Sequence, residues 1–220
     1  MTRLDYITSL LSEYNSVCDV GTDHGFVPIN AIKSYNLSKA YALDINEGPL
    51  DNARKNIISE GLSDKIECIL SDGLKDFNET VDAIVIAGMG GLLIKSIIET
   101  SLDKALKARA LILCPNKEEA SLRDFLVNNG FYIEHEHILY DKGHYYEIIK
   151  VVPGKREYNN LDILYGPFLR KEKSKDFIDK WNKKLYQLES AYKKCSRADK
   201  KDDILNKINA IKEILLYGED

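Results

Sequence analysis

The stretch Asp-Val-Gly-Thr-Asp-His-Gly, residues 19–25, follows a short apolar run and precedes a segment with helical spacing, residues 26–35. A glycine-rich loop between a strand and the next helix lies at the ligand-binding crevice of an open α/β sheet. Dinucleotide sites use the spacing G-x-G-x-x-G to face a pyrophosphate, whereas this loop has G-x-x-x-G. The carboxylates of Asp19 and Asp23 would repel a pyrophosphate at close range, so the loop favours a cationic ligand.

S-adenosylmethionine fits that description, because its methionine end carries an ammonium group and a sulfonium. Two further acids lie at the ends of the next strand-like runs, Asp44 at the second and Asp72 after the third. A carboxylate at Asp44 can accept hydrogen bonds from both ribose hydroxyls, and one at Asp72 can accept from the adenine N6 amino group. The alternative is that both acids are solvated strand-end caps. Three acids at the ends of three successive strands favour the cofactor site.

The rest of the chain up to residue 153 alternates short apolar runs with amphipathic stretches, the pattern of βαβ units and a parallel sheet. The strand-like runs are 16–21, 40–45, 65–70, 81–87, 110–114, 131–139 and 145–152. The helical stretches are 4–11, 26–35, 49–59, 92–99 and 118–128. A turn at 141–143 predicts that the last two strands form an antiparallel hairpin. The expected fold class is α/β, with five parallel strands and an antiparallel end.

Pro153-Gly154 marks a change to a Lys-rich, helical composition, which predicts one domain at 1–153 and a second at 154–220. Apolar residues spaced by three and four predict two helices that form an antiparallel coiled-coil hairpin. The seam residues are Ile178, Trp181, Leu185, Leu188, Tyr192 and Cys195, then Ile204, Ile208, Ile211 and Leu215. Such a seam can close within one chain or between two, so a monomer is favoured and a coiled-coil dimer stays open.

The two parts of the chain differ in charge. The whole chain has a net charge of −4, but residues 1–150 hold 15 Lys and Arg against 23 Asp and Glu, whereas residues 151–220 hold 16 against 12. A basic helix suits the phosphate backbone of an RNA, and its alternative is a solvated face of the coiled coil. The candidate RNA-binding residues are Arg170, Lys171, Lys180, Lys183, Lys184, Lys193, Lys194 and Arg197.

Other classes of protein receive no support. The longest nearly apolar run, 83–94, is too short to span a bilayer, and no apolar signal segment opens the chain, so no membrane association is expected. The four cysteines lie far apart, which indicates neither disulfides nor zinc. His135 and His137 share a strand face, but with no third ligand a solvated face is expected and no metal is predicted. The chain is therefore expected to be cytoplasmic.

Several motifs, taken together, resemble one known family. They are Asp-Val-Gly-Thr-Asp-His-Gly (19–25), Ala-Leu-Asp-Ile (42–45), Ser-Asp-Gly-Leu (71–74), Ala-Gly-Met-Gly-Gly (87–91), Pro-Asn (115–116) and Tyr-Tyr-Glu-Ile-Ile (145–149). Over essentially its whole length the chain resembles the bacterial tRNA (adenine(22)-N1)-methyltransferases. The resemblance implies a Rossmann-like class I methyltransferase domain that uses S-adenosylmethionine, and a C-terminal coiled coil that helps to hold tRNA.

The resemblance also assigns site residues. It implies that Gly21, Asp23, Asp44, Ile45, Asp72, Gly73 and Gly88 line the cofactor, and that Asp23, His24, Met89 and Asn116 face the transfer site. Asp19 and Gly25 of the glycine loop and Met89 complete the predicted cofactor site. One departure is Cys114, where the family leads us to expect Gln before Pro-Asn.

The chemistry needs orientation more than base catalysis, because adenine N1 carries no proton. A carboxylate near the N6 amino group would help to stabilise the positive charge that develops on the base, and Asp23 is the candidate for this role or for holding the cofactor. His24 would orient the base, or serve only as a structural hydrogen-bonding group. A stacked adenine must first be exposed, which favours base flipping. Two alternatives are a methyltransferase for another RNA site or a small molecule, and a non-catalytic RNA-binding scaffold.

Overall fold

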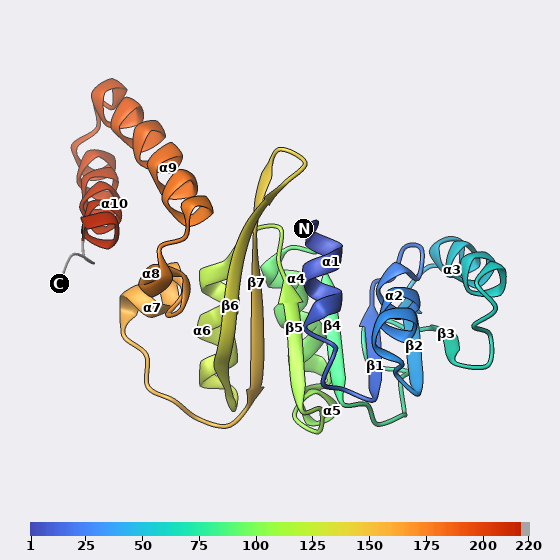
Figure 1. Cartoon of the computed structure of the whole chain (residues 1–220). Helices are drawn as coiled ribbons and strands as arrows, with labels where there is room; N and C mark the ends of the chain where they lie inside the picture. The colour runs from blue at the N-terminus through green and yellow to red at the C-terminus, as the bar shows by residue number, and fades with distance from the viewer. Residues whose placement is uncertain (217–220) are drawn as a thin grey trace.

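The computed structural model describes residues 1–216, with all side chains in that range except that of Ala198. Within this range seven strands form one sheet in the order β3-β2-β1-β4-β5-β7-β6 (Figure 1). The strands are β1 (Ser16–Val20), β2 (Lys39–Asp44), β3 (Ile66–Leu70), β4 (Ala83–Ala87), β5 (Ala110–Cys114), β6 (Phe131–Asp141) and β7 (His144–Pro153). Strands β1 to β5 pair in parallel, and β7 pairs antiparallel with both β5 and β6. The predicted parallel sheet with a terminal antiparallel hairpin is confirmed.

Helices cover both faces of this sheet. One face packs against α1 (Arg3–Ser9), α2 (Phe26–Tyr35) and α3 (Glu47–Ser59), and the other packs against α4 (Gly91–Thr100), α5 (Leu102–Ala105) and α6 (Glu119–Asn128) (Figure 1). Successive residues of a strand alternate between the two layers, so that Val17 lies in the first and Cys18 in the second, both fully buried. Burial on both faces explains why the parallel strands read as continuous apolar runs.

The β6–β7 hairpin extends beyond the edge of the sheet where the parallel strands end (Figure 1). Its strands have 11 and 10 residues, against 5 in β5, and β5 pairs with β7 only from Leu111 to Leu113. Lys142 and Gly143 form the turn, with φ angles of 47° and 90°. Positive φ at both central residues is typical of a type I′ turn, whose twist matches that of the two strands. The turn therefore lies beside the carboxyl ends of β1 and β4.

The C-terminal segment consists of α7 (Asn160–Tyr165), α8 (Leu169–Glu172), α9 (Lys175–Lys194) and α10 (Ala198–Leu216). The last two form a helical hairpin that projects to one side (Figure 1), and we call α9 and α10 the helical arm. Its base packs on the outer strand of the sheet through a third apolar cluster, which includes Ile138 of β6, Tyr165 and Ile211. The arm is therefore attached to the α/β domain by a packed base.

The predicted seam of the arm is wrong at one position, Ile178. Phe177 is fully buried where Ile178 was expected, and Ile178 is 37% exposed. On α10, Ile214 is buried and Leu215 only partly so. The physical reason is that the base of the arm packs on β6 and α7, where Tyr165 meets Trp181 edge-on. The buried face of the arm near its base therefore faces these elements as well as the partner helix.

Candidate active site

A cleft of about 660 Å³ opens at the carboxyl ends of β1 and β4. Its lining includes Asp19, Gly21, Asp23, His24 and Gly88, which the sequence places in two separate loops. Strand order reverses here, because β1 lies between β2 and β4, and such switch points are where open α/β sheets bind ligands. The opposite wall comes from α1 and the β6–β7 turn, which the sequence did not place at the site.

The glycine loop is held tightly against the end of β2. The backbone N–H groups of Gly21 and Thr22 both donate to the carbonyl oxygen of Leu43, at 2.8 and 2.9 Å. Gly21 has a φ of +79°, and a Cβ atom built on it would lie 2.0 Å from Cε of Met89. The loop after β4 thus closes over the loop after β1, and the positive φ favours glycine at position 21.

Asp19 is the buried acid of this site. Burial raises the pKa of Asp19 to about 6, because the carboxylate has lost most of its hydration. The neighbouring Thr22 hydroxyl, which is also buried, partly opposes this rise in pKa by donating toward the carboxylate. A buried carboxylate is costly, and a bound cationic ligand would stabilise it. The cleft therefore fits the methionine end of S-adenosylmethionine.

Asp23 and His24 lie at the mouth of the cleft. The Asp23 carboxylate is 74% exposed, and its Oδ2 is 3.1 Å from Nε2 of His24. The His24 ring is stacked near Phe26, and its backbone carbonyl accepts from the Asn56 side chain at 2.9 Å. His24 is thus fixed by its neighbours, and it can in turn orient the Asp23 carboxylate.

The predicted ribose and adenine ligands lie at the ends of β2 and β3 and do not line the 660 Å³ cleft. Oδ1 of Asp44 accepts from the backbone N–H of Asn46 at 2.8 Å, next to an Ile45 side chain that is 61% exposed. Asp72 forms an ion pair with Lys75. Gly73 has a φ of +63°, and a Cβ there would strike Ile97. Both roles considered for Asp44 and Asp72, a cap at the end of a strand and a ligand of the cofactor, are compatible with these contacts.

The loops after β4 and β5 are tied together by Asn116. Its backbone N–H donates to the Met89 carbonyl at 2.8 Å, and its side-chain amide donates to the Gly88 carbonyl at 2.5 Å. Asn116 therefore fixes the shape of the second glycine loop. Cys114 is fully buried, and burial raises the pKa of its thiol to about 12. Cys114, which stands where the family leads us to expect Gln, therefore lies in the protein interior.

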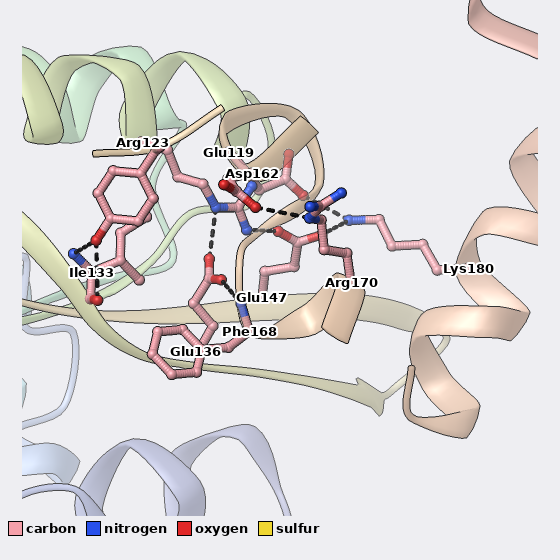
Figure 2. A network of polar contacts seen from close by, with 10 residues as sticks. Glu119, Arg123, Ile133, Glu136, Glu147, Asp162, Phe168, Arg170 and Lys180 are labelled. Atoms are coloured by element: carbon pink, nitrogen blue, oxygen red, sulfur yellow. Dashed lines mark hydrogen bonds and ion pairs between the residues drawn. The ribbon is translucent and has the colours of Figure 1, made fainter. Parts of the chain in front are cut away.

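A buried network of charges, which the sequence analysis missed, connects α6, β6, β7 and the arm (Figure 2). Nε of Arg123 donates to Glu136 at 2.6 Å, and its Nη2 pairs with Glu147. The other oxygen of Glu147 accepts from Lys180 at 2.6 Å, and Lys180 also reaches Glu119 at 3.0 Å. Burial raises the pKa of Glu147, but the charges of Lys180 and Arg123 outweigh it and hold this pKa below its ordinary value.

This network corrects the prediction for Lys180. The amine is held by two carboxylates and the side chain is only 21% exposed, so it is no free contact for an RNA phosphate. Arg170 likewise pairs with Asp162. By contrast, the remaining candidates are exposed, and these are Lys171, Lys183, Lys184, Lys193, Lys194 and Arg197. Of these, Arg197 pairs with Asp199.

His135 and His137 both contact Tyr6 of α1. Nε2 of His135 is 2.8 Å from the Tyr6 hydroxyl, and the His137 ring stacks on Tyr6 with centroids 4.0 Å apart. The expected solvated face is thus wrong, because α1 packs over it and leaves both histidines half-buried. Within residues 1–216 no group of three or more His, Cys, Asp or Glu side chains could hold a metal ion. No helix in that range is both long and apolar enough to cross a membrane.

Comparisons with known proteins identify the family of this chain. The sequence profile of the tRNA (adenine(22)-N(1))-methyltransferase family matches residues 17–214, a range that begins after α1. A curated tRNA (adenine(22)-N(1))-methyltransferase of Bacillus subtilis is 31% identical, with 98% of this chain and 97% of the relative aligned.

The fold of this chain is also similar to those of solved methyltransferase structures. A Streptococcus pneumoniae protein described as a tRNA (m1A22) methyltransferase, in complex with S-adenosyl-L-methionine, superposes with a TM-score of 0.91 at 40% identity, over 98% of this chain and all of that one. The Mycoplasma capricolum TrmK in complex with S-adenosyl-homocysteine gives a TM-score of 0.88 at 28% identity, over 98% and 97% of the two chains.

Proposed function

The chain belongs to the tRNA (adenine(22)-N(1))-methyltransferase family, and we propose from that membership which of its residues perform the reaction. It is a methyltransferase that transfers a methyl group from S-adenosylmethionine to N1 of adenine 22 in tRNA. This excludes the non-catalytic scaffold and the other methyl acceptors considered above. The observation that carries our assignment of roles is the convergence of Asp19, Gly21, Asp23 and Gly88 on one cleft.

For the cofactor, we assign the acids of the cleft to its cationic end. S-adenosylmethionine, when bound, supplies a methyl group activated by its sulfonium. Asp19 faces the site from within the protein, and ionises at the pH of the cell despite its burial. Gly21 and Met89 shape the site, since the Met89 side chain closes over the loop at Gly21. Asp44 and Ile45 serve the ribose and one face of the adenine, and Asp72 with Gly73 serves the adenine edge. Gly25 lets the loop turn into α2, because its φ is +70°.

For the transfer, Asp23 is the proposed catalytic residue. Its exposed carboxylate can accept a hydrogen bond from the N6 amino group of the target adenine and so orient N1 toward the methyl group. The same negative charge stabilises the positive charge that develops on the ring. His24 positions Asp23 through their 3.1 Å contact. Asn116 and Met89 position the second glycine loop beside the reacting atoms.

For the tRNA, we propose that the exposed lysines of the arm bind the phosphate backbone. Lys183, Lys184, Lys193 and Lys194 lie on α9, outside the buried network. Lys180 instead serves to hold the arm against the α/β domain, as described above. A target adenine within a structured arm of tRNA must leave its stack to reach the cleft, which implies a flipped base.

The organisation of the chain follows from the same features. We propose a methyltransferase domain at 1–153 and a tRNA-binding domain at 154–220, since the third apolar cluster lies almost wholly in the second segment. The pairing of α9 with α10 within one chain supports a monomer. A cytoplasmic location, with all four cysteines as free thiols, is the corresponding expectation.

The test is to incubate the protein with labelled S-adenosylmethionine and unmodified tRNA, and then to map the methylated nucleoside. We expect N1-methyladenosine at position 22, and a tRNA transcript with G at position 22 should accept no label. Label in another nucleoside would contradict the assigned target. No label with intact cofactor binding by calorimetry would contradict the roles given to Asp23 and the arm.

A further inference from the structure

Arg3, the first residue of α1, stands at the mouth of the cleft without a charged partner. Its guanidinium carbon lies 4.5 Å from the centroid of the Tyr146 ring, so the planar cation rests on an aromatic face. Its backbone N–H donates to Oδ2 of Asp141 at 3.3 Å, which ties α1 to the β6–β7 turn. Among the ion pairs of residues 1–216, none includes Arg3. An arginine that is held in place but has no carboxylate partner is available to an anion.

The position of Arg3 links two cavities. Arg3 lines the 660 Å³ cleft together with Asp23 and Gly88. Tyr146, on which it rests, lines a second cavity of about 540 Å³ beside the first. That second cavity also includes Asn116 of the site and Lys180 at the base of the arm. The guanidinium therefore lies where a strand of RNA running from the arm to the cleft would pass.

The positive charge of Arg3 affects the Cys114 thiol at the end of β5. Burial raises the pKa of the Cys114 thiol, and the positive charge of Arg3 partly opposes that rise. Since Cys114 precedes Pro115 and Asn116, the guanidinium lies close to the loop that carries Asn116. This agrees with the contact to Tyr146 and places the cation beside the proposed transfer site.

The acids of the site make such a cation necessary. Asp19 and Asp23 of the cleft suit a cationic cofactor, but they repel the phosphates that flank a flipped adenine. Arginine offers several donors in one plane and suits a phosphate better than lysine does. We propose that Arg3, held flat on Tyr146, binds a backbone phosphate of the target nucleotide, and that the adjoining nucleotide occupies the second cavity. This rests on the proposed function of the same cleft.

The experiment compares the steady-state methylation of tRNA by Arg3→Ala, Arg3→Lys and a matched control, Arg156→Ala. Arg156 also rests on a tyrosine, with its guanidinium carbon 4.8 Å from the Tyr132 ring, but Tyr132 lies at the start of β6, at the opposite end from the turn. We expect Arg3→Ala to raise KM for tRNA about tenfold, the value of one charge-assisted hydrogen bond. The slope of log affinity against log salt should fall by about one contact. Arg3→Lys should recover only part of the loss, since it keeps the charge without the planar stack.

Two further measurements separate the possible failures. Affinity for S-adenosylmethionine, measured by calorimetry, should be equal in all variants, and Arg3→Gln covers the case in which Arg3→Ala lowers the melting temperature. If the unsubstituted protein methylates adenine 22 and Arg3→Ala and Arg3→Gln match Arg156→Ala in KM and salt slope, the role of Arg3 is overturned. If the unsubstituted protein does not methylate adenine 22, it is the proposed function that fails.

Discussion

The Met89 side chain lies directly over Gly21, so close that a Cβ on Gly21 would approach its Cε to 2.0 Å. The two residues belong to loops that follow different strands, β1 and β4, and their contact joins these two loops beside the cleft. Met89 can lie this close because Gly21 has no Cβ atom, and adding that atom tests the contact directly.

Gly21→Ala should lose most of its affinity for S-adenosylmethionine. The new methyl group displaces the Met89 side chain at the proposed cofactor site, and we expect about a tenfold loss of affinity, which corresponds to about 1.4 kcal/mol. The φ of +79° also strains the alanine backbone by roughly 1–2 kcal/mol, a cost in folding stability that the control shares. Gly61→Ala is the matched control, because Gly61 has a φ of +68° but no atom within 4 Å of the added carbon. Calorimetric titration should show weak binding only for the first variant. Equal affinities would show that the contact with Met89 does not shape the site.

Asp23→Asn should lower kcat by about 10²–10³, the size of effect found for other electrostatic transition-state groups. KM for tRNA should change little, because one carboxylate at the mouth of the cleft adds nothing to phosphate binding. Asp64→Asn, at an exposed aspartate before β3, is the control and should have normal turnover. A kcat within a few-fold of the unsubstituted protein would remove Asp23 from the mechanism.

The pKa of Asp19 predicts a dependence on pH. Because burial raises this pKa to about 6, the folded state binds a proton between pH 4 and 6 that the unfolded state releases, and the stability contributed by Asp19 falls as pH rises through that window. At pH 7, Asp19→Asn should therefore be more stable by about 2–3 kcal/mol without cofactor. Its affinity for S-adenosylmethionine should be low and flat between pH 5 and 7.5, whereas that of the unsubstituted protein should rise. Denaturation and titration across this range check both statements, and an equally stable variant would refute the first.

Arg123→Leu should destabilise the fold by about 3 kcal/mol, because it leaves Glu136 and Glu147 buried with one cation fewer. Arg54→Leu offers a matched control, since Arg54 also pairs with two carboxylates, Glu47 and Asp51, but at the surface. There the loss should stay below about 1 kcal/mol. Urea denaturation at pH 7 measures both, and similar losses would mean that the buried network contributes no more than a surface pair.

Replacing Lys183 and Lys184 with Gln should weaken tRNA binding and reduce its salt slope by about two contacts. Lys180→Gln should instead lower the melting temperature and leave the salt slope unchanged, since its amine is held by Glu119 and Glu147. Filter binding at several salt concentrations separates the two effects. Should Lys180→Gln flatten the salt dependence as much as the double variant, the structural role of Lys180 would be wrong.

Most of the fold could be predicted because its signals are local. The bounds of β5 and α2 agree with the predicted ranges, since each is a continuous apolar or amphipathic run with a turn residue at its end. The short helices α5, α7 and α8 were missed, because 4 to 6 residues carry too little periodicity.

The buried charges could not be predicted, because burial depends on the whole fold. A register shift between Ile133 and His135 interrupts the alternation of β6. After this shift Glu136 points to the face covered by α6, where Arg123 lies, although strict alternation from Ile133 would have turned it to the other face. The same limit applies to Lys180, which looks like any other lysine of a basic helix until β7 places Glu147 against it.

Strand β7 carries two neighbouring residues with opposite tasks. The Tyr146 ring contacts the guanidinium of Arg3 on one face of the strand. The Glu147 carboxylate forms ion pairs with Arg123 and Lys180 on the other face. Because successive side chains of a strand point to opposite faces, one residue inserted between Tyr146 and Glu147 would turn both side chains to the same face, and one of the two sets of contacts would be lost. An insertion at this point therefore keeps both sets of contacts only if it adds an even number of residues, or if a bulge absorbs the extra residue. The alternation of side chains along this one strand thus joins the catalytic cleft on one face of the sheet to the arm on the other.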